Sequence, residues 1–515
     1  MRTTTDLDVL VVGAGLSGIG AACHLRLRCP QLSFAVLEGR DRIGGTWDLF
    51  RYPGVRSDSD MHTLGYSFAP WRGGETLADG PSILAYVRET AQRFGVSDHV
   101  RTGHRVVAAR WSGEDARWTV QVEVGGGNGG GAARVGDGGG QSAGSLTLSC
   151  RFLLLCTGYY RYDRGHAPAI EGVQDFQGEL VHPQHWPEEL DCAGRRVIVI
   201  GSGATAVTLV PALARTAAHV TMVQRSPSWI VSVPSRDRIA RWLDRRLPER
   251  LAHRAVRAKN EGLMIASYQL SRRRPTLMAA LLRAGARREL PAGYPVDVHF
   301  NPSYDPWDQR MCVVPDGDLF RAVADGRATI VTDTVKRLTP TGLRLGGGEE
   351  LDADVIVTAT GLELLALGGV ALEVDGEPID LPQRLVYRGM MLSGVPNLAF
   401  TVGYTNASWT LKADLTARHV CRLLTHMGRH GHATAVPVPS GTEGERRPLI
   451  GLASGYVRRS LHEFPSQGSR RPWLVRQNYW LDVLDFRRGG VDDGVMRFDG
   501  AGTMGVAQPE PAGAR

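Results

Sequence analysis

Two glycine-rich loops, far apart in the sequence, constrain the fold of this chain more than any other feature. Each loop follows a short apolar run, which is typical of a buried parallel strand that ends in a tight turn. Glycines in such a loop let the backbone approach a pyrophosphate, whose charge the next helix N-terminus stabilises. The candidate phosphate-binding positions are Gly13, Gly15, Ser17 and Gly18 in the first loop, and Gly201, Ser202, Gly203, Ala204, Thr205 and Ala206 in the second. We therefore expect an α/β protein with two Rossmann-like dinucleotide-binding domains.

The residue after the second strand of each domain predicts which dinucleotide that domain binds. Glu38 follows the strand expected at residues 34–37, where a carboxylate accepts hydrogen bonds from a ribose diol and repels a 2′-phosphate. Arg225 and Ser226 take the corresponding place in the second domain, and a guanidinium can bind that phosphate. The sequence thus predicts FAD in the first domain and NADPH in the second. The alternatives are a solvated acid at position 38 and a purely structural Arg225.

Two longer motifs carry a family resemblance. Residues 176–187 read Phe-x-Gly-x-x-x-His-x-x-x-Trp-Pro, and residues 44–58 read Gly-Gly-x-Trp, four residues, Tyr-Pro-Gly, three residues and Asp. Together they resemble the motifs of the Baeyer–Villiger branch of the class B flavin monooxygenases. The N-oxygenating sister branch carries Tyr or Phe where Trp186 stands. Residues 47–60 and 403–412 are most similar to a mycobacterial, thioamide-oxygenating branch of the family.

The resemblance implies a reaction and a set of catalytic residues. Such enzymes use NADPH and O₂ to oxidise ketones to esters, and to S-oxygenate sulfides and thioamides, through a C4a-peroxyflavin. Arg310 matches the essential arginine of the family, Asp58 would hold it, and His182 would coordinate domain movement. Gln309 stands where many members carry a lysine for the NADPH phosphate, so NADPH selectivity would rest more heavily on Arg225.

Further cofactor contacts are expected on the flavin side. Gly45 and Thr46 would bring their backbone close to the flavin, and Trp47 would form a wall of its site. Val106 lies in a β-hairpin expected at residues 100–124, where its backbone amide would approach the adenine. Residues 125–145 are nearly all Gly, Ala and Ser, so we predict a mobile loop within that hairpin region.

The motifs also predict the domain organisation, with a helical insertion in the second dinucleotide domain. Residues 236–290 have a helical period and are rich in arginine. The expected segments are 1–159 (FAD-binding domain, first part), 160–190 (linker with the fingerprint), 191–235 (NADP-binding domain, first part), 236–306 (helical insertion), 307–384 (NADP-binding domain, second part) and 385–515 (FAD-binding domain, second part, with a loose tail of about 15 residues).

The composition of the chain limits the binding partners and the cellular compartment that we expect for it. The chain of 515 residues has a net charge of +7, carried almost entirely by arginine, but no nucleic-acid-binding motif accompanies that charge. The seven cysteines show neither a metal-ligand spacing nor a Cys-x-x-Cys pair, so we expect no metal site and a reducing cytoplasm. We expect neither a signal peptide nor a membrane-spanning helix. The basic surface of residues 236–290 predicts a solvated face, with at most weak peripheral contact with the inner membrane surface.

Two other functions are compatible with parts of this pattern. An N-oxygenating flavin monooxygenase would use the same cofactors without needing Arg310, although Trp186 argues against it. A non-enzymatic redox sensor that binds NADPH and FAD is the most different alternative. A flavin disulfide reductase is disfavoured, because Cys23 and Cys29 lack the motif of its redox pair.

Overall fold

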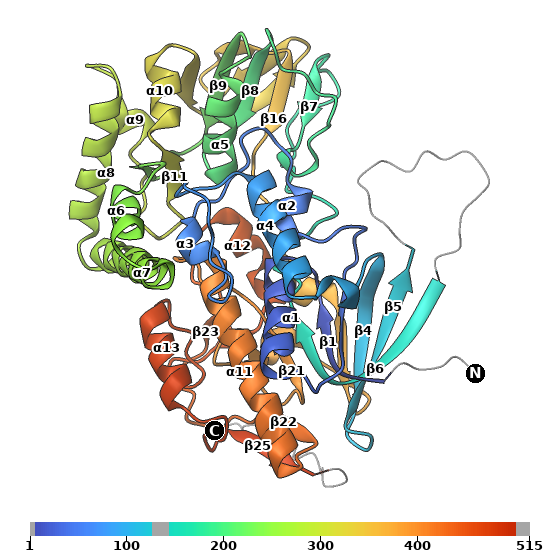
Figure 1. Ribbon diagram of the computed structural model, residues 1–515. Coiled ribbons are helices and arrows are strands. Elements are labelled where there is room, and N and C mark those ends of the chain that lie inside the picture. The colour runs from blue at the N-terminus through green and yellow to red at the C-terminus, as the bar shows by residue number, and fades with distance from the viewer. Residues whose placement is uncertain (1–5, 126–143, 501–515) are drawn as a thin grey trace, which may run out of the picture.

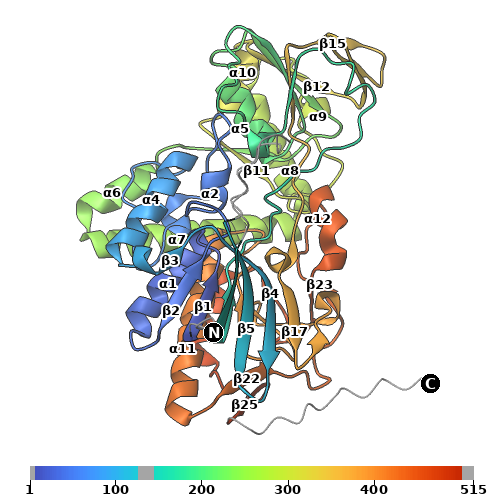
Figure 2. The ribbon, with the colours of Figure 1, turned by 90° about the vertical axis from the view of Figure 1, so that its right-hand side faces the viewer.

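The computed structural model describes residues 6–125 and 144–500. Most of the loop expected at residues 125–145, and the C-terminal tail expected after residue 500, lie outside the described residues. Two α/β bodies are stacked, with strands β8, β9 and β16 in one and β1, β4, β5 and β6 in the other (Figure 1). Figure 2 shows α2 at the level where the two bodies meet.

The first body is built on a nine-stranded sheet in the order β18-β17-β4-β5-β6-β1-β2-β3, with β21 also paired to β6. Strand β1 pairs in parallel with β2 and β6, while β4, β5 and β6 form the antiparallel hairpin region expected from the sequence. The strands are β1 (Asp6–Val12), β2 (Phe34–Leu37), β3 (Val100–Arg101), β4 (His104–Ser112), β5 (Arg117–Val124), β6 (Gly144–Leu155), β17 (Ala371–Val374), β18 (Glu377–Pro378) and β21 (Leu398–Phe400).

Helix α1 shows why glycines are needed after β1. A Cβ atom on Gly18 would come 1.8 Å from the carbonyl oxygen of Gly13, so helix and strand can approach this closely only without one. Gly13 itself has a φ of +99°, a conformation that favours glycine. The helix is buried from Leu16 to Leu25 and packs against α11. The helices of this body are α1 (Leu16–Arg28), α2 (Thr46–Leu49), α3 (Met61–Leu64), α4 (Gly80–Arg93), α11 (Trp409–His430), α12 (Gly455–Ser460) and α13 (Tyr479–Arg488).

The second body holds a five-stranded parallel sheet in the order β12-β9-β8-β16-β7. Its edge strand β7 comes from the fingerprint at residues 176–187, so part of the expected linker belongs to this sheet. Its elements are β7 (Glu179–Val181), β8 (Arg196–Ile200), α5 (Ala204–Leu213), β9 (His219–Gln224), α10 (Asp318–Ala324), β12 (Ala328–Thr332) and β16 (Val355–Thr358), with a small antiparallel sheet of β13 (Val335–Thr339), β14 (Gly342–Leu345) and β15 (Glu350–Asp352).

The insertion between β9 and α10 is helical, as its sequence period predicts. It lies beside the junction of the two bodies, and α7 contacts α3 of the first body (Figure 1). It consists of β10 (Ile230–Val233), α6 (Arg238–Arg246), α7 (Glu249–Arg273), α8 (Pro275–Glu289), α9 (Val296–His299) and β11 (Cys312–Pro315), with β10 and β11 paired in parallel.

The chain re-enters the first body earlier than residue 385, the expected boundary. Strands β17 and β18 extend the first sheet, because β17 pairs in parallel with the edge of β4. Four short two-stranded ladders complete the fold, one of them β10–β11; the remaining strands are β19 (Val386–Tyr387), β20 (Met391–Leu392), β22 (Thr434–Pro437), β23 (Arg447–Pro448), β24 (Ser466–Gln467) and β25 (Met496–Asp499). Among the described residues, no helix is long and apolar enough to cross a membrane.

Candidate active site at the junction of the two bodies

A cavity of about 460 Å³ opens between the two bodies. Its walls come from the first glycine loop, α2, the chain that follows β6, the start of α5, and the segment before β11. Of the positions expected from the sequence, those that line it are Gly13, Gly15, Ser17, Glu38, Gly45, Thr46, Trp47, Asp58, Val106, Ala204, Thr205 and Arg310. Residues from both loops and from the catalytic prediction therefore meet in one space.

Glu38 lines the cavity and is buried beside the first loop. Its carboxylate accepts hydrogen bonds from the backbone N–H of Ala14, at 2.8 Å, and of Arg40, at 3.0 Å. Burial raises the pKa of Glu38 above its ordinary value, although these two donors oppose the shift. The carboxylate is thus held in place after β2, where it also faces the cavity.

The cavity wall also carries the cation predicted to be catalytic. Nη2 of Arg310 donates to Oδ1 of Asp58 at 2.9 Å, and the two side chains, 28% and 32% exposed, face the cavity. Burial lowers the pKa of Arg310, but the charge of Asp58 and smaller contributions from Tyr159, Tyr160 and Tyr456 together outweigh burial and raise that pKa. Two residues before Asp58, Arg56 forms two hydrogen bonds with Asp318 of α10, at 2.6 and 3.3 Å. The motif at residues 44–58 is thereby fastened to the second body.

The second loop has the geometry of a phosphate-binding turn. Gly201 has a φ of +134°, and a Cβ there would come 2.3 Å from the carbonyl oxygen of Ala359. A Cβ on Gly203 would meet nothing within 4 Å, so this side of the loop is open. Ser202 donates from Oγ to the carbonyl oxygen of Ser226, at 2.9 Å. The cavity does not include Gly201, Ser202 or Gly203. The second glycine loop therefore reaches the cavity of the first loop only through the start of α5.

The comparisons with known proteins agree with this architecture. Residues 149–268 match the family model described as flavin-binding monooxygenase-like, and residues 11–72 match an NAD(P)-binding Rossmann-like domain. The chain is 51% identical to the FAD-containing monooxygenase EthA of Mycobacterium tuberculosis, with 99% of this chain and 100% of that protein covered. The chain belongs to the family of FAD-containing monooxygenases. The flavin monooxygenase resemblance of the fingerprint, including its mycobacterial branch, is thus confirmed.

Two further comparisons place this FAD-containing monooxygenase more widely. It is 48% identical to the putative FAD-containing monooxygenase MymA of Mycobacterium tuberculosis, over 96% of this chain and 98% of that protein. Its fold is similar to that of an oxidized steroid monooxygenase bound to NADP, with a TM-score of 0.71 at 21% identity, over 96% of this chain and all of that one. The predicted fold of two dinucleotide domains is confirmed.

The residues of this FAD-containing monooxygenase fit a flavin dinucleotide in the cavity. A Cβ on Gly45 would come 3.0 Å from the Cα of Gly15. Because both residues are glycines, no side chain fills this part of the cavity wall. Trp47 and Trp409 both line the cavity, and Nε1 of Trp409 donates to Oγ of Ser17 at 2.6 Å. Gly18 does not line it, because it packs against Gly13 instead.

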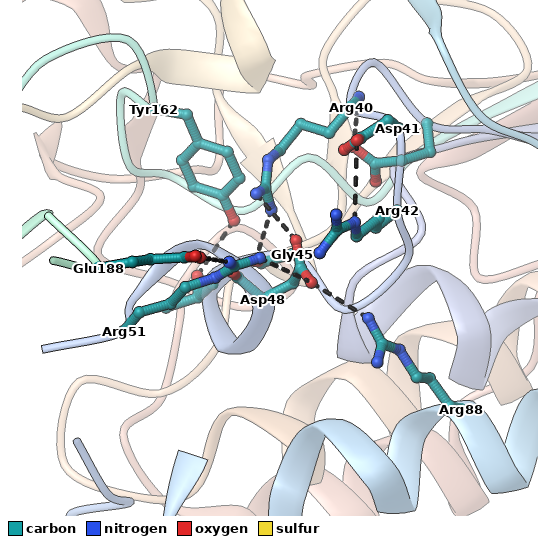
Figure 3. A network of polar contacts seen from close by, with 11 residues as sticks. Arg40, Asp41, Arg42, Gly45, Asp48, Arg51, Arg88, Tyr162 and Glu188 are labelled. Carbon is teal, nitrogen blue, oxygen red and sulfur yellow. Dashed lines mark hydrogen bonds and ion pairs between the residues drawn. The ribbon is translucent and has the colours of Figure 1, made fainter. Parts of the chain in front are cut away.

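An ion-pair network around Asp48 holds the flavin-side motif in place (Figure 3). Asp48 is 1% exposed, yet three guanidinium groups surround its carboxylate: Arg40 at 2.8 Å, Arg88 of α4 at 3.1 Å and Arg51 at 3.8 Å. Arg51 also pairs with Glu188, just after the fingerprint. The network joins the chain after β2, the motif that contains α2, helix α4 and the linker, although the sequence patterns do not identify Asp48 as a site residue.

Aromatic hydroxyl groups near Arg310 are a second feature that sequence reasoning missed. The hydroxyl groups of Tyr159 and Tyr160, both lining the cavity, lie 3.2 Å apart, and burial raises both pKa values. Tyr52, in the Tyr-Pro-Gly part of the second motif, interacts with Thr205 of the second loop, and burial raises its pKa to about 12. All three phenols therefore stay protonated near neutral pH. Only their position after a strand or within a motif could have drawn attention to them.

His182 and Arg225 are not brought into the cavity. Nδ1 of His182 accepts from the backbone N–H of Gln184 at 3.2 Å, and Nε2 donates to the carbonyl oxygen of Gly361 at 3.3 Å. Burial lowers the pKa of His182, so the ring is neutral. Arg225 lies exposed at the end of β9, and within residues 6–125 and 144–500 its guanidinium has no hydrogen-bond or ion-pair partner.

Proposed function

We propose that this FAD-containing monooxygenase uses NADPH and O₂ to carry out Baeyer–Villiger oxidation of ketones to esters, and S-oxygenation of sulfides and thioamides. The contact between Arg310 and Asp58 at the wall of the cavity is the observation that carries the proposal. The contact supports a role for Arg310 as a fixed positive charge beside the oxygen atoms that would develop negative charge during oxygen transfer. The Phe-x-Gly-x-x-x-His-x-x-x-Trp-Pro fingerprint at residues 176–187 supports the same branch of the family.

When bound, FAD supplies hydride acceptance and the activation of O₂. Arg310 acts as a cation that stabilises negative charge on the reacting oxygen atoms, and Asp58 orients its guanidinium. Removing a comparable preorganised donor costs about 3–4 kcal/mol of transition-state stabilisation. The pyrophosphate is expected against the backbone of Gly13, Gly15 and Ser17, and the ribose diol against Glu38. Gly45, Thr46 and Trp47 would then adjoin the flavin ring, and the Val106 amide the adenine.

NADPH is assigned to the second loop. The pyrophosphate would lie on the open side of Gly203, near the backbone of Gly201, Ser202, Ala204 and Thr205. Ala206 is fully buried, which supports a packing role for it at the third glycine position. Arg225, which is exposed and has no polar partner in the described part of the chain, would bind the 2′-phosphate together with the neighbouring Ser226, since Gln309 offers no positive charge.

His182 is proposed to act between the domains rather than on substrate. Its two ring nitrogens join the fingerprint to Gly361, in the connection between β16 and the first body. Gly361 lies just after β16, where the chain leaves the second body, so the contact holds the fingerprint against a segment that would bend if the angle between the bodies changed. We therefore assign His182 a positioning role in the domain movement that accompanies the change from reduction to oxygenation.

The surface of α6 supports a weak peripheral membrane contact of a cytoplasmic enzyme. Ile239 and Trp242 are each 55% exposed on this helix, next to several arginines, and the guanidinium of Arg246 lies 5.5 Å from the ring of Trp242. Exposed apolar side chains flanked by cations suit an anionic lipid surface. The seven cysteines are all unpaired, which fits a reducing compartment.

Product analysis tests the reaction. Purified enzyme is incubated with NADPH, O₂ and a panel of ketones, sulfides, thioamides and tertiary amines, and wild type is compared with Arg310→Ala. We expect esters and sulfoxides from the wild type. In the variant, FAD reduction by NADPH should persist while ester formation falls by about 10²–10³-fold, with the electrons recovered as hydrogen peroxide. N-oxide as the main product would favour N-oxygenation, and NADPH consumption without any oxygenated product would favour the redox sensor.

A further inference from the structure

Three histidines meet at the end of α11 that lies far from the cavity. His426 and His430 are one helical turn apart, so they share a face of the helix. Gly431 then adopts a left-handed conformation, with a φ of +69°, and turns the chain back toward them. The backbone N–H of His432 donates to the carbonyl oxygen of Met427 at 2.9 Å, which closes the helix with a Schellman-type cap. The local backbone therefore fixes the third histidine beside the first two.

The side-chain geometry suits a metal ion. One ring nitrogen from each of His426, His430 and His432 lies within 4.8 Å of the others. Three imidazoles on a tetrahedral zinc ion, with Zn–N bonds of about 2.0–2.1 Å, have nitrogens about 3.4 Å apart. Small rotations of partly exposed rings can close that difference, and solvent can reach the group.

The hydrogen bonding of the rings also favours ligation. Nδ1 of His430 donates to the carbonyl oxygen of His426 at 2.9 Å, so Nε2 is the nitrogen that the neutral ring offers to a metal. Phe498 of β25 packs against His426 and His432, with ring centroids 4.9 Å from each, and so restricts both rings.

We propose that His426, His430 and His432 form a binding site for a divalent transition-metal ion that prefers imidazole nitrogen, with Zn²⁺ as the physiological class. Cysteine spacing could not reveal this site, because it uses no cysteine. Helix α11 begins at Trp409, which lines the cavity, and its 22 residues span about 33 Å. The ion would therefore be structural: it would fix the end of α11 to the turn that leads into β22, beside the ladder of β22 and β25 (Figure 1).

The test uses the full-length chain without a histidine tag, stripped of metal with a chelator. Zn²⁺ is titrated in competition with a chromogenic chelator, and Co²⁺ binding is followed by its visible absorption. We expect one ion per chain, with micromolar or tighter affinity, and a thermal unfolding midpoint that rises with Zn²⁺. His430→Ala and His432→Ala should each weaken binding by at least the roughly 10–100-fold that loss of an outer-shell partner costs. His462→Ala, at an exposed position outside the group, is the matched control and should bind as the wild type does.

The FAD content of each variant, measured by absorbance, reports whether the protein is folded. His430 is exposed, so its replacement should leave that content unchanged. Absence of a saturable site in the wild type would overturn the proposal. The same holds if folded His430→Ala and His432→Ala proteins bind Zn²⁺ as tightly as the wild type. Neither result depends on the monooxygenase reaction, so the outcome is independent of the proposed function.

Discussion

Arg310 and Asp58 are 252 positions apart in the sequence, yet one guanidinium nitrogen of Arg310 lies 2.9 Å from a carboxylate oxygen of Asp58. Asp58 belongs to the first body, and Arg310 belongs to the segment between α9 and β11 of the insertion. The pair therefore spans the junction of the two bodies, and its geometry depends on how they are docked. The neighbouring pair of Arg56 and Asp318 crosses the same junction with the charges reversed.

Asp58→Asn should reduce oxygenation more than flavin reduction. The amide oxygen can still accept a hydrogen bond, but the negative charge that holds the guanidinium is lost. A charge-assisted hydrogen bond contributes roughly 1.5–3 kcal/mol, so kcat/KM for ester formation should fall by about 10–100-fold. Asp163→Asn, which removes another carboxylate of the cavity wall, should have little effect. Equal losses in the two variants would contradict the assignment.

Since only Nη2 contacts Asp58, we expect Arg310→Lys to retain part of the activity that Arg310→Ala loses.

Arg225→Ala should weaken the preference for NADPH over NADH. The guanidinium is exposed and has no partner among the described residues, so its replacement should leave the fold intact. Loss of its bonds to the 2′-phosphate should lower kcat/KM for NADPH by roughly 10–100-fold and leave NADH almost unchanged. Steady-state NADPH and NADH oxidation measure both values. Arg215→Ala, an exposed arginine of the same body, is the control. A wild type that uses both coenzymes equally well would refute the assignment.

Asp318→Asn should destabilise the docking of the two bodies. Arg56 and Asp318 are only 13% and 14% exposed and share two hydrogen bonds, so the change leaves a partly buried guanidinium without its counter-charge. The free energy of unfolding should fall by roughly 1.5–3 kcal/mol. Asp325→Asn, in an exposed pair with Arg327 at the end of the same helix, should cost less than about 1 kcal/mol. Urea denaturation of both variants gives the comparison, and similar losses would show that the buried pair has no special role.

Stability should fall as the pH drops below about 6.5, the ordinary pKa of histidine. His419 is buried, and burial, together with the charges of Arg388, Arg422 and Lys412, lowers its pKa well below that value. Below pH 6.5 the unfolded chain binds a proton that the native state does not, so the stability present above that pH is progressively lost. His419→Gln keeps an acceptor for the 2.9 Å contact with Arg422 but does not titrate. The urea midpoint of His419→Gln should change less between pH 7.5 and 5 than that of the wild type. An identical change would show that His419 does not contribute to the pH dependence of stability.

Contact of α6 with anionic lipid should be weak and sensitive to salt. Sedimentation with phosphatidylglycerol-containing vesicles should decrease sharply as ionic strength rises, because arginine supplies most of the attraction. Trp242→Ala should weaken binding further, whereas Trp480→Ala, at an exposed position on α13, should not. Pelleting that resists salt would mean that apolar insertion dominates, and no pelleting at low salt would remove the membrane proposal.

Local sequence patterns were sufficient to predict both nucleotide loops and the helices that follow them. Gly13 and Gly201 require backbone conformations that glycine favours, and Glu38 stands where the end of β2 must place it. The helical insertion was likewise predictable, because its period reflects local amphipathic structure. The family motif correctly paired Arg310 with Asp58. Apart from the pair of Arg310 and Asp58, which only the family resemblance indicated, these features depend on residues that are close in sequence.

The tertiary structure alone decided the features that join distant segments. Asp48 lies within a known motif, but its three arginines come from a loop, a helix and the motif itself, so no spacing could reveal their convergence. The membership of β17 in the first sheet depends on an open edge of β4. The meeting of His432 with His426 and His430 depends on the turn at Gly431 and on packing against Phe498. The sequence by itself therefore determined the local turns, the helices and the family of this protein. The docking of the two bodies decided which charges meet, because electrostatic pairing depends on distances in space that chain separation does not encode.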